Sequence, residues 1–273
     1  MSLFAVLNAT PDSIDRQGEL PATKELVLQA RQLLAEGAAF IDVGAQATNP
    51  WAEEITAEEE WRRLEPLLAE LLEAFPGRIS IDTFRAEVAE KALEFGKVIL
   101  NDVTMFHNPQ MIDLAAEHQV RCILSHLPIA ANGIVGWAHK NANMDQPLDV
   151  LKELLARRRQ MIAAGIQPQN IIIDPGIGFG KTSSLNRRLL EFGDFVTDTA
   201  LLRGLDPEIL NEPEMKVMIG ASYKRIIAEH FGGDKKAPQA NLRAARIAVN
   251  HGANYLRVHE PRVYRELLLN PQK

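Results

Sequence analysis

Polar side chains follow eight short apolar runs in this sequence, and their chemistry divides into two groups. Acceptor-rich side chains come after the second, third, fourth and sixth runs, namely Asp42, Asp82, Asn101 and Asp174. Basic side chains follow the seventh and eighth runs, namely Lys224, Arg257 and His259. A carboxylate accepts two parallel hydrogen bonds, so the first group suits a heterocycle with adjacent N–H donors. The second group suits phosphate, so we predict a ligand with a donor-rich ring and a phosphate tail.

A simpler explanation exists for any one of these positions. An Asp or Asn after a strand is commonly a turn former or a helix N-cap. That explanation weakens when a polar residue follows all eight runs. The segment Gly220-Ala221-Ser222 lies near the basic group and directly precedes a predicted helix. Its backbone N–H groups could therefore also bind an anion.

The apolar runs alternate with amphipathic segments along the whole chain. We predict strands at Phe4–Leu7, Phe40–Val43, Ile79–Ile81, Val98–Leu100, Arg121–Leu124, Ile171–Ile173, Val217–Ile219 and Tyr255–Val258. We predict helices at Pro21–Glu36, Thr56–Phe75, Arg85–Phe95, Pro109–His118, Leu148–Ala164, Ser184–Phe192, Tyr223–Phe231, Ala240–Asn250 and Arg262–Leu269. Two stretches, Pro128–Pro147 and Gly193–Glu214, are long for simple loops.

An eightfold strand–helix alternation in 273 residues predicts an α/β protein with a (β/α)₈ barrel, as a single domain over residues 1–273. The continuous apolar runs are typical of parallel strands that are buried on both faces. A doubly wound open sheet is the alternative, since periodicity does not separate the two. In a barrel all strands end at one face, which would bring the polar residues together.

The composition of the chain limits the classes of binding partner and the cellular location that we expect. The formal net charge of −6 argues against binding to nucleic acid or to an anionic membrane surface. No apolar run approaches the roughly 18 residues that a membrane span needs. The segment Met1–Leu7 lacks the charged region and cleavage site of a secretory signal, and Cys122 is the only cysteine. We therefore expect a cytoplasmic protein without disulfides, with Cys122 as a core residue.

Several motifs resemble those of the dihydropteroate synthase family. Leu7-Asn8-Ala9-Thr10-Pro11-Asp12-Ser13 is similar to its first signature, and Ile41-Asp42-Val43-Gly44 with Thr48 and Pro50 resembles a degenerate second one. The remaining motifs follow in the family's order and spacing: Asp82-Thr83, Asn101-Asp102, the block from Asp174 to Lys181, Ser222-Tyr223-Lys224 and Arg257-Val258-His259. The resemblance covers essentially the whole chain. It implies a barrel enzyme of folate biosynthesis that joins 6-hydroxymethyl-7,8-dihydropterin diphosphate to 4-aminobenzoate and releases pyrophosphate.

The resemblance also implies roles for single residues. Asp82, Asn101 and Asp174 would hold the pterin edge, Lys224 would hydrogen-bond its ring, and Arg257 with His259 would bind the diphosphate. Asn8 would associate with Mg²⁺, the expected cofactor, and Asn8, Lys224, Arg257 and His259 would be the catalytic residues. Phe179 and Ser222 would lie near the aminobenzoate, with Asp42 and Thr48 as further substrate-binding residues. The family's usual assembly is a homodimer.

The sequence departs from the family pattern in the first two loops and at one residue beside Lys224. Asn49 stands where the family has an arginine, and Trp51 replaces a glycine. We hypothesise that Arg16 supplies the missing charge, and that sulfonamides bind poorly because they share the aminobenzoate pocket. Tyr223 replaces the arginine of a Ser-Arg-Lys motif.

Two other functions remain open from the sequence. One is a methyltetrahydrofolate-dependent methyltransferase, which needs no diphosphate site and is therefore disfavoured by the three basic residues. The other is a pterin-binding paralogue without turnover, or with altered specificity, which the changed loops motivate. Elsewhere, Arg157-Arg158-Arg159 is typical of a solvated helix face, and Lys181 does not complete a phosphate-binding P-loop because Pro175 occupies the first required glycine.

Overall fold

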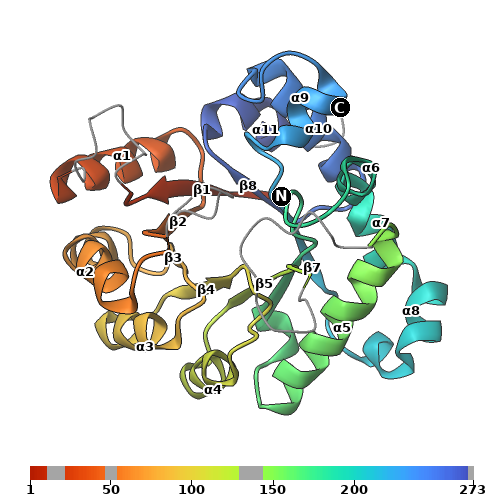
Figure 1. Ribbon diagram of the computed structural model, residues 1–273, viewed down its shortest axis with the longest axis horizontal. Coiled ribbons are helices and arrows are strands. Elements are labelled where there is room, and N and C mark those ends of the chain that lie inside the picture. The colour runs from red at the N-terminus through yellow and green to blue at the C-terminus, as the bar shows by residue number, and fades with distance from the viewer. Residues whose placement is uncertain (11–21, 47–53, 129–143, 270–273) are drawn as a thin grey trace.

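Eight parallel strands close into a barrel in the computed structural model, which describes residues 1–10, 22–46, 54–128 and 144–269 (Figure 1). The strands are β1 (Ser2–Asn8), β2 (Phe40–Gly44), β3 (Ile79–Asp82), β4 (Ile99–Asp102), β5 (Cys122–Ser125), β6 (Ile171–Asp174), β7 (Lys216–Ile219) and β8 (Tyr255–Val258). Each strand pairs with its sequence neighbours, and β8 pairs with β1. The predicted (β/α)₈ barrel is confirmed, and the open-sheet alternative is wrong.

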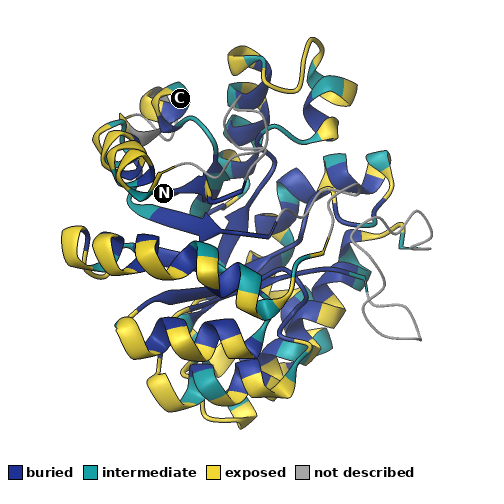
Figure 2. Cartoon of the chain, turned by 60° about the vertical axis from the view of Figure 1, so that its left-hand side comes forward, coloured by how far each residue is buried: buried dark blue, intermediate teal, exposed yellow. Residues whose placement is uncertain are grey.

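Helices surround the barrel, and the longer ones have buried residues on one side and exposed residues on the other (Figure 2). They are α1 (Thr23–Ala35), α2 (Ala57–Ala74), α3 (Ala86–Phe95), α4 (Pro109–His118), α5 (Pro147–Ala163), α6 (Ser183–Arg188), α7 (Phe192–Thr197), α8 (Thr199–Leu205), α9 (Arg225–Phe231), α10 (Pro238–Asn250) and α11 (Arg265–Leu269). In α2, Leu64, Leu67, Leu68 and Leu71 are buried at helical spacing. Within the described part of the chain, no helix is long and apolar enough to span a membrane.

Helix starts follow the local sequence signals. The Thr56 side chain accepts a hydrogen bond from the Glu59 N–H at 3.2 Å, which is one of the two bonds of a capping box. The Asn108 side chain caps α4 by accepting from the Gln110 N–H at 3.0 Å, with Pro109 at the first helical position. These contacts satisfy N–H groups that a helix start leaves without an intrahelical partner.

The stretch 193–214 is not a loop, because α8 and a 3₁₀ helix at Pro207–Asn211 lie within it and α7 covers its start. The arginine run on α5 explains part of this arrangement. Arg158 is buried and forms an ion pair with Glu212, while Arg159 pairs with Asp206. The prediction of a solvated face is therefore wrong for Arg158, which attaches α5 to the segment before β7.

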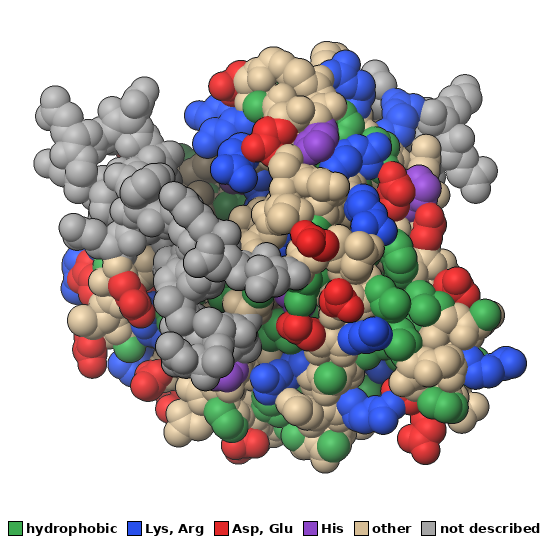
Figure 3. All heavy atoms as spheres, turned by 45° about the vertical axis from the view of Figure 1, so that its right-hand side comes forward, with side chains coloured by type: hydrophobic (Ala, Val, Ile, Leu, Met, Phe, Trp, Pro, Cys, Tyr) green, Lys and Arg blue, Asp and Glu red, His purple; other side chains and the backbone are tan. Residues whose placement is uncertain are grey.

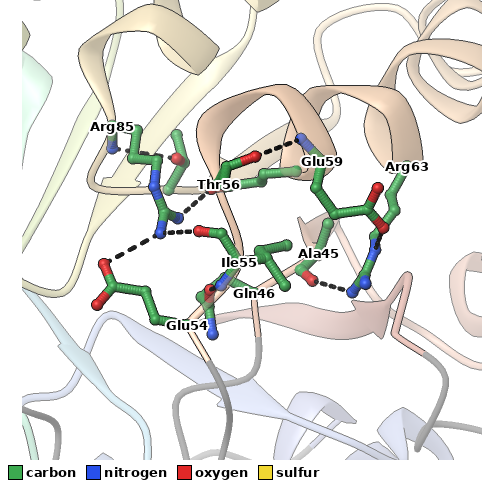
Figure 4. A network of polar contacts seen from close by, with 10 residues as sticks. Ala45, Gln46, Glu54, Ile55, Thr56, Glu59, Arg63 and Arg85 are labelled. Atoms are coloured by element: carbon green, nitrogen blue, oxygen red, sulfur yellow. Dashed lines mark hydrogen bonds and ion pairs between the residues drawn. The ribbon is translucent and has the colours of Figure 1, made fainter.

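The end of β2 and the start of α2 are fastened to each other by polar contacts (Figure 4). The Gln46 side chain accepts a hydrogen bond from the Ile55 N–H at 2.9 Å. Arg85, just before α3, donates to the Ile55 carbonyl and pairs with Glu54 and with the buried Glu60. Arg63 on α2 donates to the Ala45 carbonyl at 3.3 Å. The chain therefore leaves β2 and enters α2 at fixed positions.

The barrel interior has an apolar layer and, above it, a polar layer. The apolar layer contains Phe4, Ile99, Ile123, Ile172 and Met218, with Phe40 and Tyr255 packed against it. Side chains alternate between the two faces of a strand, so the residue two positions later points the same way. That residue is polar on five strands: Asp42, Asn101, Ser125, Asp174 and Arg257. The polar layer lies at the carboxyl ends of the strands, where barrel enzymes build their active sites.

Candidate active site

Arg257 lies within the acidic side of the polar layer and joins two of its carboxylates. Its guanidinium donates from Nε to Asp42 and from an NH₂ group to Asp82. Asp42 also accepts a hydrogen bond from the Asn101 side-chain amide at 3.0 Å. The sequence predicts an acceptor-rich group of residues and a separate basic group. The structure instead interlocks them, because Arg257 is at an inward position of β8 and must share the barrel interior with its neighbours.

Burial raises the proton affinity of two carboxyl groups in this layer, those of Asp82 and Asp174. Burial raises the pKa of Asp82 to about 7; Arg257 opposes the shift and Asp42 adds to it. Burial also raises the pKa of Asp174, against the attraction of Lys224. Burial works to lower the pKa of Arg257, but Asp42 and Asp82 outweigh it and raise that pKa above its ordinary value. The guanidinium therefore stays charged, while the Asp82 carboxyl can bind a proton near neutral pH.

Acceptor capacity is left over in this group. Oδ1 of Asp42 and Oδ1 of Asn101 are buried and have no hydrogen-bond partner among the described residues. A buried acceptor without a partner is costly unless a ligand or water satisfies it. The arrangement therefore favours a ligand that brings N–H donors into the mouth of the barrel.

Asp174 is positioned by the glycine-rich block that follows it. Its Oδ1 accepts a hydrogen bond from the Gly176 N–H at 2.7 Å. Gly176 has a left-handed φ of 64°, and a Cβ there would lie 1.9 Å from the His126 carbonyl oxygen. Only glycine fits such a close backbone approach. This geometry explains why Asp-Pro-Gly occurs at the end of β6.

Lys181 organises the same loop and was not predicted to have a role. It is buried, and its Nζ donates to the carbonyls of His126, Gly176 and Phe179 at 3.1, 2.9 and 3.1 Å. Burial lowers its pKa well below the ordinary value for lysine. These bonds tie the loop after β6 to the end of β5. The signal in the sequence was a lysine after three glycines, which also occurs in unrelated motifs.

Lys224 follows β7 and faces the loop that contains Phe179. Its Nζ donates to the Ile177 carbonyl and lies 4.4 Å from the centroid of the Phe179 ring, a cation–π distance. Burial lowers the pKa of Lys224 to about 8, and Asp174 partly counters the shift. Phe179 itself packs with Val103 and Leu127 in a small apolar cluster at this rim. The structure thus places a cation and an apolar surface side by side next to Asp174.

His259 lies after β8 beside Ser222 and Tyr223. Its Nδ1 is 3.2 Å from the Ser222 Oγ, and its ring stacks on that of Tyr223 with centroids 4.5 Å apart. Burial, followed by the charges of Arg257 and Lys224, lowers the pKa of His259 to about 3. Our prediction that it is a third cation is therefore wrong, because the ring is neutral at physiological pH. A neutral imidazole still offers one N–H donor.

Asn8 lies at the end of β1 on the same rim and is exposed. Its side chain makes no hydrogen bond to any other described residue, so its amide oxygen is available. In the described segments, no three His, Cys, Asp or Glu residues gather closely enough to hold a metal. The amide oxygen of Asn8 is a hard ligand of the kind that Mg²⁺ takes, and Mg²⁺ often binds through few protein atoms, water and substrate phosphates. Thr48, Arg16 and Asn49 lie outside the described residues.

Two polar residues at strand ends point away from the site. Asp102 follows inward-facing Asn101 and accepts hydrogen bonds from the backbone N–H and hydroxyl of Thr104, both at 2.7 Å. His126 faces α5, where its Nε2 is 3.1 Å from Glu153. The inward residue at the end of β5 is Ser125, which pairs in register with Asp174. Ser125 is not among the site residues predicted from the sequence, although it directly follows the predicted strand Arg121–Leu124.

Comparisons with known proteins agree with this geometry. The family model described as "Pterin binding enzyme" matches residues 4–259. The dihydropteroate synthase from Streptococcus pyogenes is 32% identical to this chain, and the match covers 98% of this chain and 93% of that protein. The dihydropteroate synthase from Neisseria meningitidis serogroup C is 34% identical, over 94% of this chain and 87% of that protein. The structure of Xanthomonas albilineans dihydropteroate synthase with 4-aminobenzoic acid has a TM-score of 0.82 at 29% identity, covering 99% of this chain and 92% of that one. The same enzyme with 7,8-dihydropteroate gives a TM-score of 0.79.

Proposed function

The chain belongs to the family of pterin-binding enzymes, and from that membership and the geometry of the rim we infer that it is a dihydropteroate synthase. It condenses 6-hydroxymethyl-7,8-dihydropterin diphosphate with 4-aminobenzoate and releases pyrophosphate, in folate biosynthesis. The observation that carries this conclusion is the inward-facing layer in which Asp42, Asp82 and Asn101 lie in one bonded group with Arg257.

The pterin end of the substrate belongs to the acidic side of this layer. Asp82, Asn101 and Asp174 accept hydrogen bonds from the ring N–H groups, and the free oxygens of Asp42 and Asn101 supply further acceptors. Lys224 donates to a ring acceptor on the opposite edge. A site built to hydrogen-bond a ligand rejects analogues that lack the matching groups, because its own buried polar atoms are then left unpaired.

The diphosphate end belongs to the β7–β8 corner. Arg257 and the N–H of neutral His259 donate to its oxygens, together with backbone N–H groups of the Gly220–Ser222 segment. Such donors stabilise the charge that develops on the leaving group. When bound at Asn8, Mg²⁺ would add a hard cation that neutralises phosphate charge.

The reaction exchanges one bond to carbon for another. The methylene carbon loses its bond to the diphosphate oxygen, whose electron pair leaves with pyrophosphate. The aniline nitrogen of 4-aminobenzoate forms the new bond and releases its proton to solvent. The acidic layer stabilises positive charge on the pterin methylene as the bond to oxygen breaks. Phe179 and Ser222 would contact the aminobenzoate beside this carbon, and no residue needs to form a covalent intermediate.

A coupled assay of pyrophosphate release tests the proposal. The purified chain is given the pterin diphosphate and Mg²⁺, with and without 4-aminobenzoate. Release that requires both substrates is the expected result. Tight pterin binding without release would favour the paralogue without turnover, and methyl transfer from methyltetrahydrofolate to a corrinoid would favour the methyltransferase. Omitting Mg²⁺ should abolish most of the release, and an unchanged rate would remove the metal from the proposal.

Assembly, location and drug response remain parts of the proposal. A homodimer is proposed from the family's usual assembly, and sedimentation of the purified chain measures it. A cytoplasmic location is proposed because Cys122 is the only cysteine of the chain, which fits a reducing compartment. Weak sulfonamide binding and a role for Arg16 also stay predictions. An inhibition constant and the turnover of an Arg16→Ala variant measure these two directly.

A further inference from the structure

Tyr223 is the one residue of the Ser222–Lys224 motif that departs from the family pattern, and it contacts a residue of the neighbouring strand end. Its ring lies nearly parallel to the His259 imidazole, with centroids 4.5 Å apart and planes inclined by 8°. Tyr223 follows β7 and His259 follows β8. The stack therefore connects the two segments that form the diphosphate corner.

The backbone of Tyr223 is held in a conformation that is unfavourable for tyrosine. Its φ of 61° is left-handed, and bulky residues rarely adopt that region. Its N–H donates to Oδ1 of the buried Asn241 at 3.1 Å, and its hydroxyl donates to Glu260. Asn241 in turn donates to the carbonyls of Lys235 and Ala237 at 2.7 and 3.0 Å. A strained residue persists when surrounding contacts over-determine it, and such residues cluster at functional sites.

The other contacts of His259 come from Ser222. The Ser222 Oγ accepts the His259 backbone N–H at 3.3 Å and lies 3.2 Å from Nδ1 of the ring. Nδ1 and one ring face are thus occupied. Nε2 has no hydrogen bond to any residue in the described part of the chain, so it is the imidazole atom available to a ligand.

We propose that Tyr223 is a positioning residue that fixes the His259 ring so that Nε2 meets the diphosphate of the substrate. This inference rests on the proposed function, from which the diphosphate is taken. Ser222 alone holds one atom of the ring and leaves rotation about the bond to Cβ. The Tyr223 ring covers a face and removes that freedom, which lowers the entropy cost of binding.

A double-mutant cycle on the full chain tests whether Tyr223 acts through His259. Tyr223→Asn removes the ring and suits the left-handed backbone, while Tyr223→Phe keeps the stack and loses only the bond to Glu260. Affinity for inorganic pyrophosphate with Mg²⁺ is measured by calorimetry. We expect Tyr223→Asn to weaken binding about threefold to tenfold and Tyr223→Phe to change it less than about twofold. In a His259→Ala background, Tyr223→Asn should have no further effect. Equal losses in both backgrounds would overturn the proposal.

A spectroscopic measurement gives a second answer that needs no turnover. The ring current of Tyr223 shifts the proton resonances of the His259 imidazole, so Tyr223→Asn should move them and Tyr223→Phe should largely preserve them. Unmoved resonances in Tyr223→Asn would refute the stack. Tyr223→Gly, which also tolerates the backbone, replaces Tyr223→Asn if that variant does not fold. Absent synthase activity in the unmodified chain would instead refute the proposed function while leaving both of these measurements interpretable.

Discussion

The carboxyl ends of the strands present two sets of buried polar residues, one facing the barrel axis and one facing the helices. Asn101 and Asp102 are adjacent in sequence, and both are buried at the end of β4. Asn101 donates across the barrel to Asp42, whereas Asp102 organises its own turn through Thr104. At the end of β5, Ser125 faces the axis and His126 faces α5. Neighbouring polar residues therefore face different surroundings. We expect those that face the barrel axis to contribute to ligand binding and those that face the helices to contribute to folding stability.

The two sets differ in their surroundings, although each contains buried polar atoms without a hydrogen-bond partner among the described residues, such as Oδ2 of Asp102 and Nδ1 of His126 in the outer set. The inner set keeps free acceptor atoms on Asp42 and Asn101 around a charged arginine. Asp102 faces away from the barrel axis, and its Oδ1 accepts hydrogen bonds from the backbone N–H and the hydroxyl of Thr104. Burial raises the pKa of Asp102 to about 6. Mutations should therefore separate them. Inner substitutions should remove binding, and outer ones should mainly reduce stability. The face seen in Figure 3 mixes acidic and basic side chains.

The largest effect should come from substitution of Arg257, which we expect to reduce both ligand binding and stability. Arg257→Met leaves Asp42 and Asp82 without their cation, and removal of one partner of a buried ion pair costs about 3–5 kcal/mol of stability. Arg257 lowers the pKa of Asp82, so its loss raises that pKa further. The protonated acid tolerates burial, so the destabilisation should grow as pH rises through about 7 and shrink below it. Urea unfolding at pH 5 and pH 8 measures this, and equal losses at both would contradict it.

The matched outer substitution is Arg158→Met. Arg158 is also buried and paired with an acid, but it lies on α5 away from the site. We expect a loss of stability of about 3 kcal/mol with unchanged synthase activity per folded molecule. A variant of Arg158 that lost activity while remaining folded would remove the distinction between the two sets.

Asp174→Asn should separate binding from folding within the inner set. Asparagine keeps an oxygen for the Gly176 N–H but loses the charge and one acceptor toward the pterin. Hydrogen bonds to charged groups are the stronger ones, so we expect pterin affinity to fall roughly 100-fold with little change in Tm. Fluorescence titration with a pterin and thermal unfolding measure the two quantities. Asp102→Asn is the control, with the opposite pattern expected.

His126 should produce a pH effect on stability without a direct effect on binding. Burial lowers its pKa to about 4 from an ordinary 6.5. Between these values the unfolded chain binds more protons, so stability is fully present above pH 6.5 and falls as pH decreases toward 4. The contribution is at most about 3 kcal/mol. His126→Gln should reduce the slope of unfolding free energy over this range, and an unchanged slope would show that other groups cause it.

The smallest effect should come from Ser125, which only the structure places in the inner set. Ser125→Ala removes one hydroxyl at the level of Asp174. We expect pterin affinity to fall about threefold to tenfold, with unfolding free energy within about 0.5 kcal/mol of the original. An unaltered affinity would exclude Ser125 from the ligand contacts and limit the inner set to the charged and amide residues.

Sequence reasoning predicted most residues of the polar layer because the signals for them are local. The apolar runs, the polar residue after each run and the glycine block at 176–180 are periodic or contiguous patterns, and each strand forms where one was predicted. The strand bounds moved by one or two residues in several cases, as when β4 ends at Asp102 and not at Leu100. Thr56 and Asn108 also cap their helices as local signals indicate. Helices within residues 193–214 were missed, since short helices without a strong apolar period depend on packing against the rest of the chain.

What the sequence by itself determined is therefore the barrel and the positions at which polar chemistry occurs. Tertiary structure alone decided which member of each polar pair faces the axis, because the direction depends on the pleat of a strand and on closure of the sheet. It also placed Arg257 between Asp42 and Asp82, although β8 is more than 170 residues from either strand along the chain. Burial then set the charge states, leaving His259 neutral and Asp82 ready to bind a proton near pH 7. Desolvation depends on every atom around a group, and a linear pattern of residue types does not contain that information.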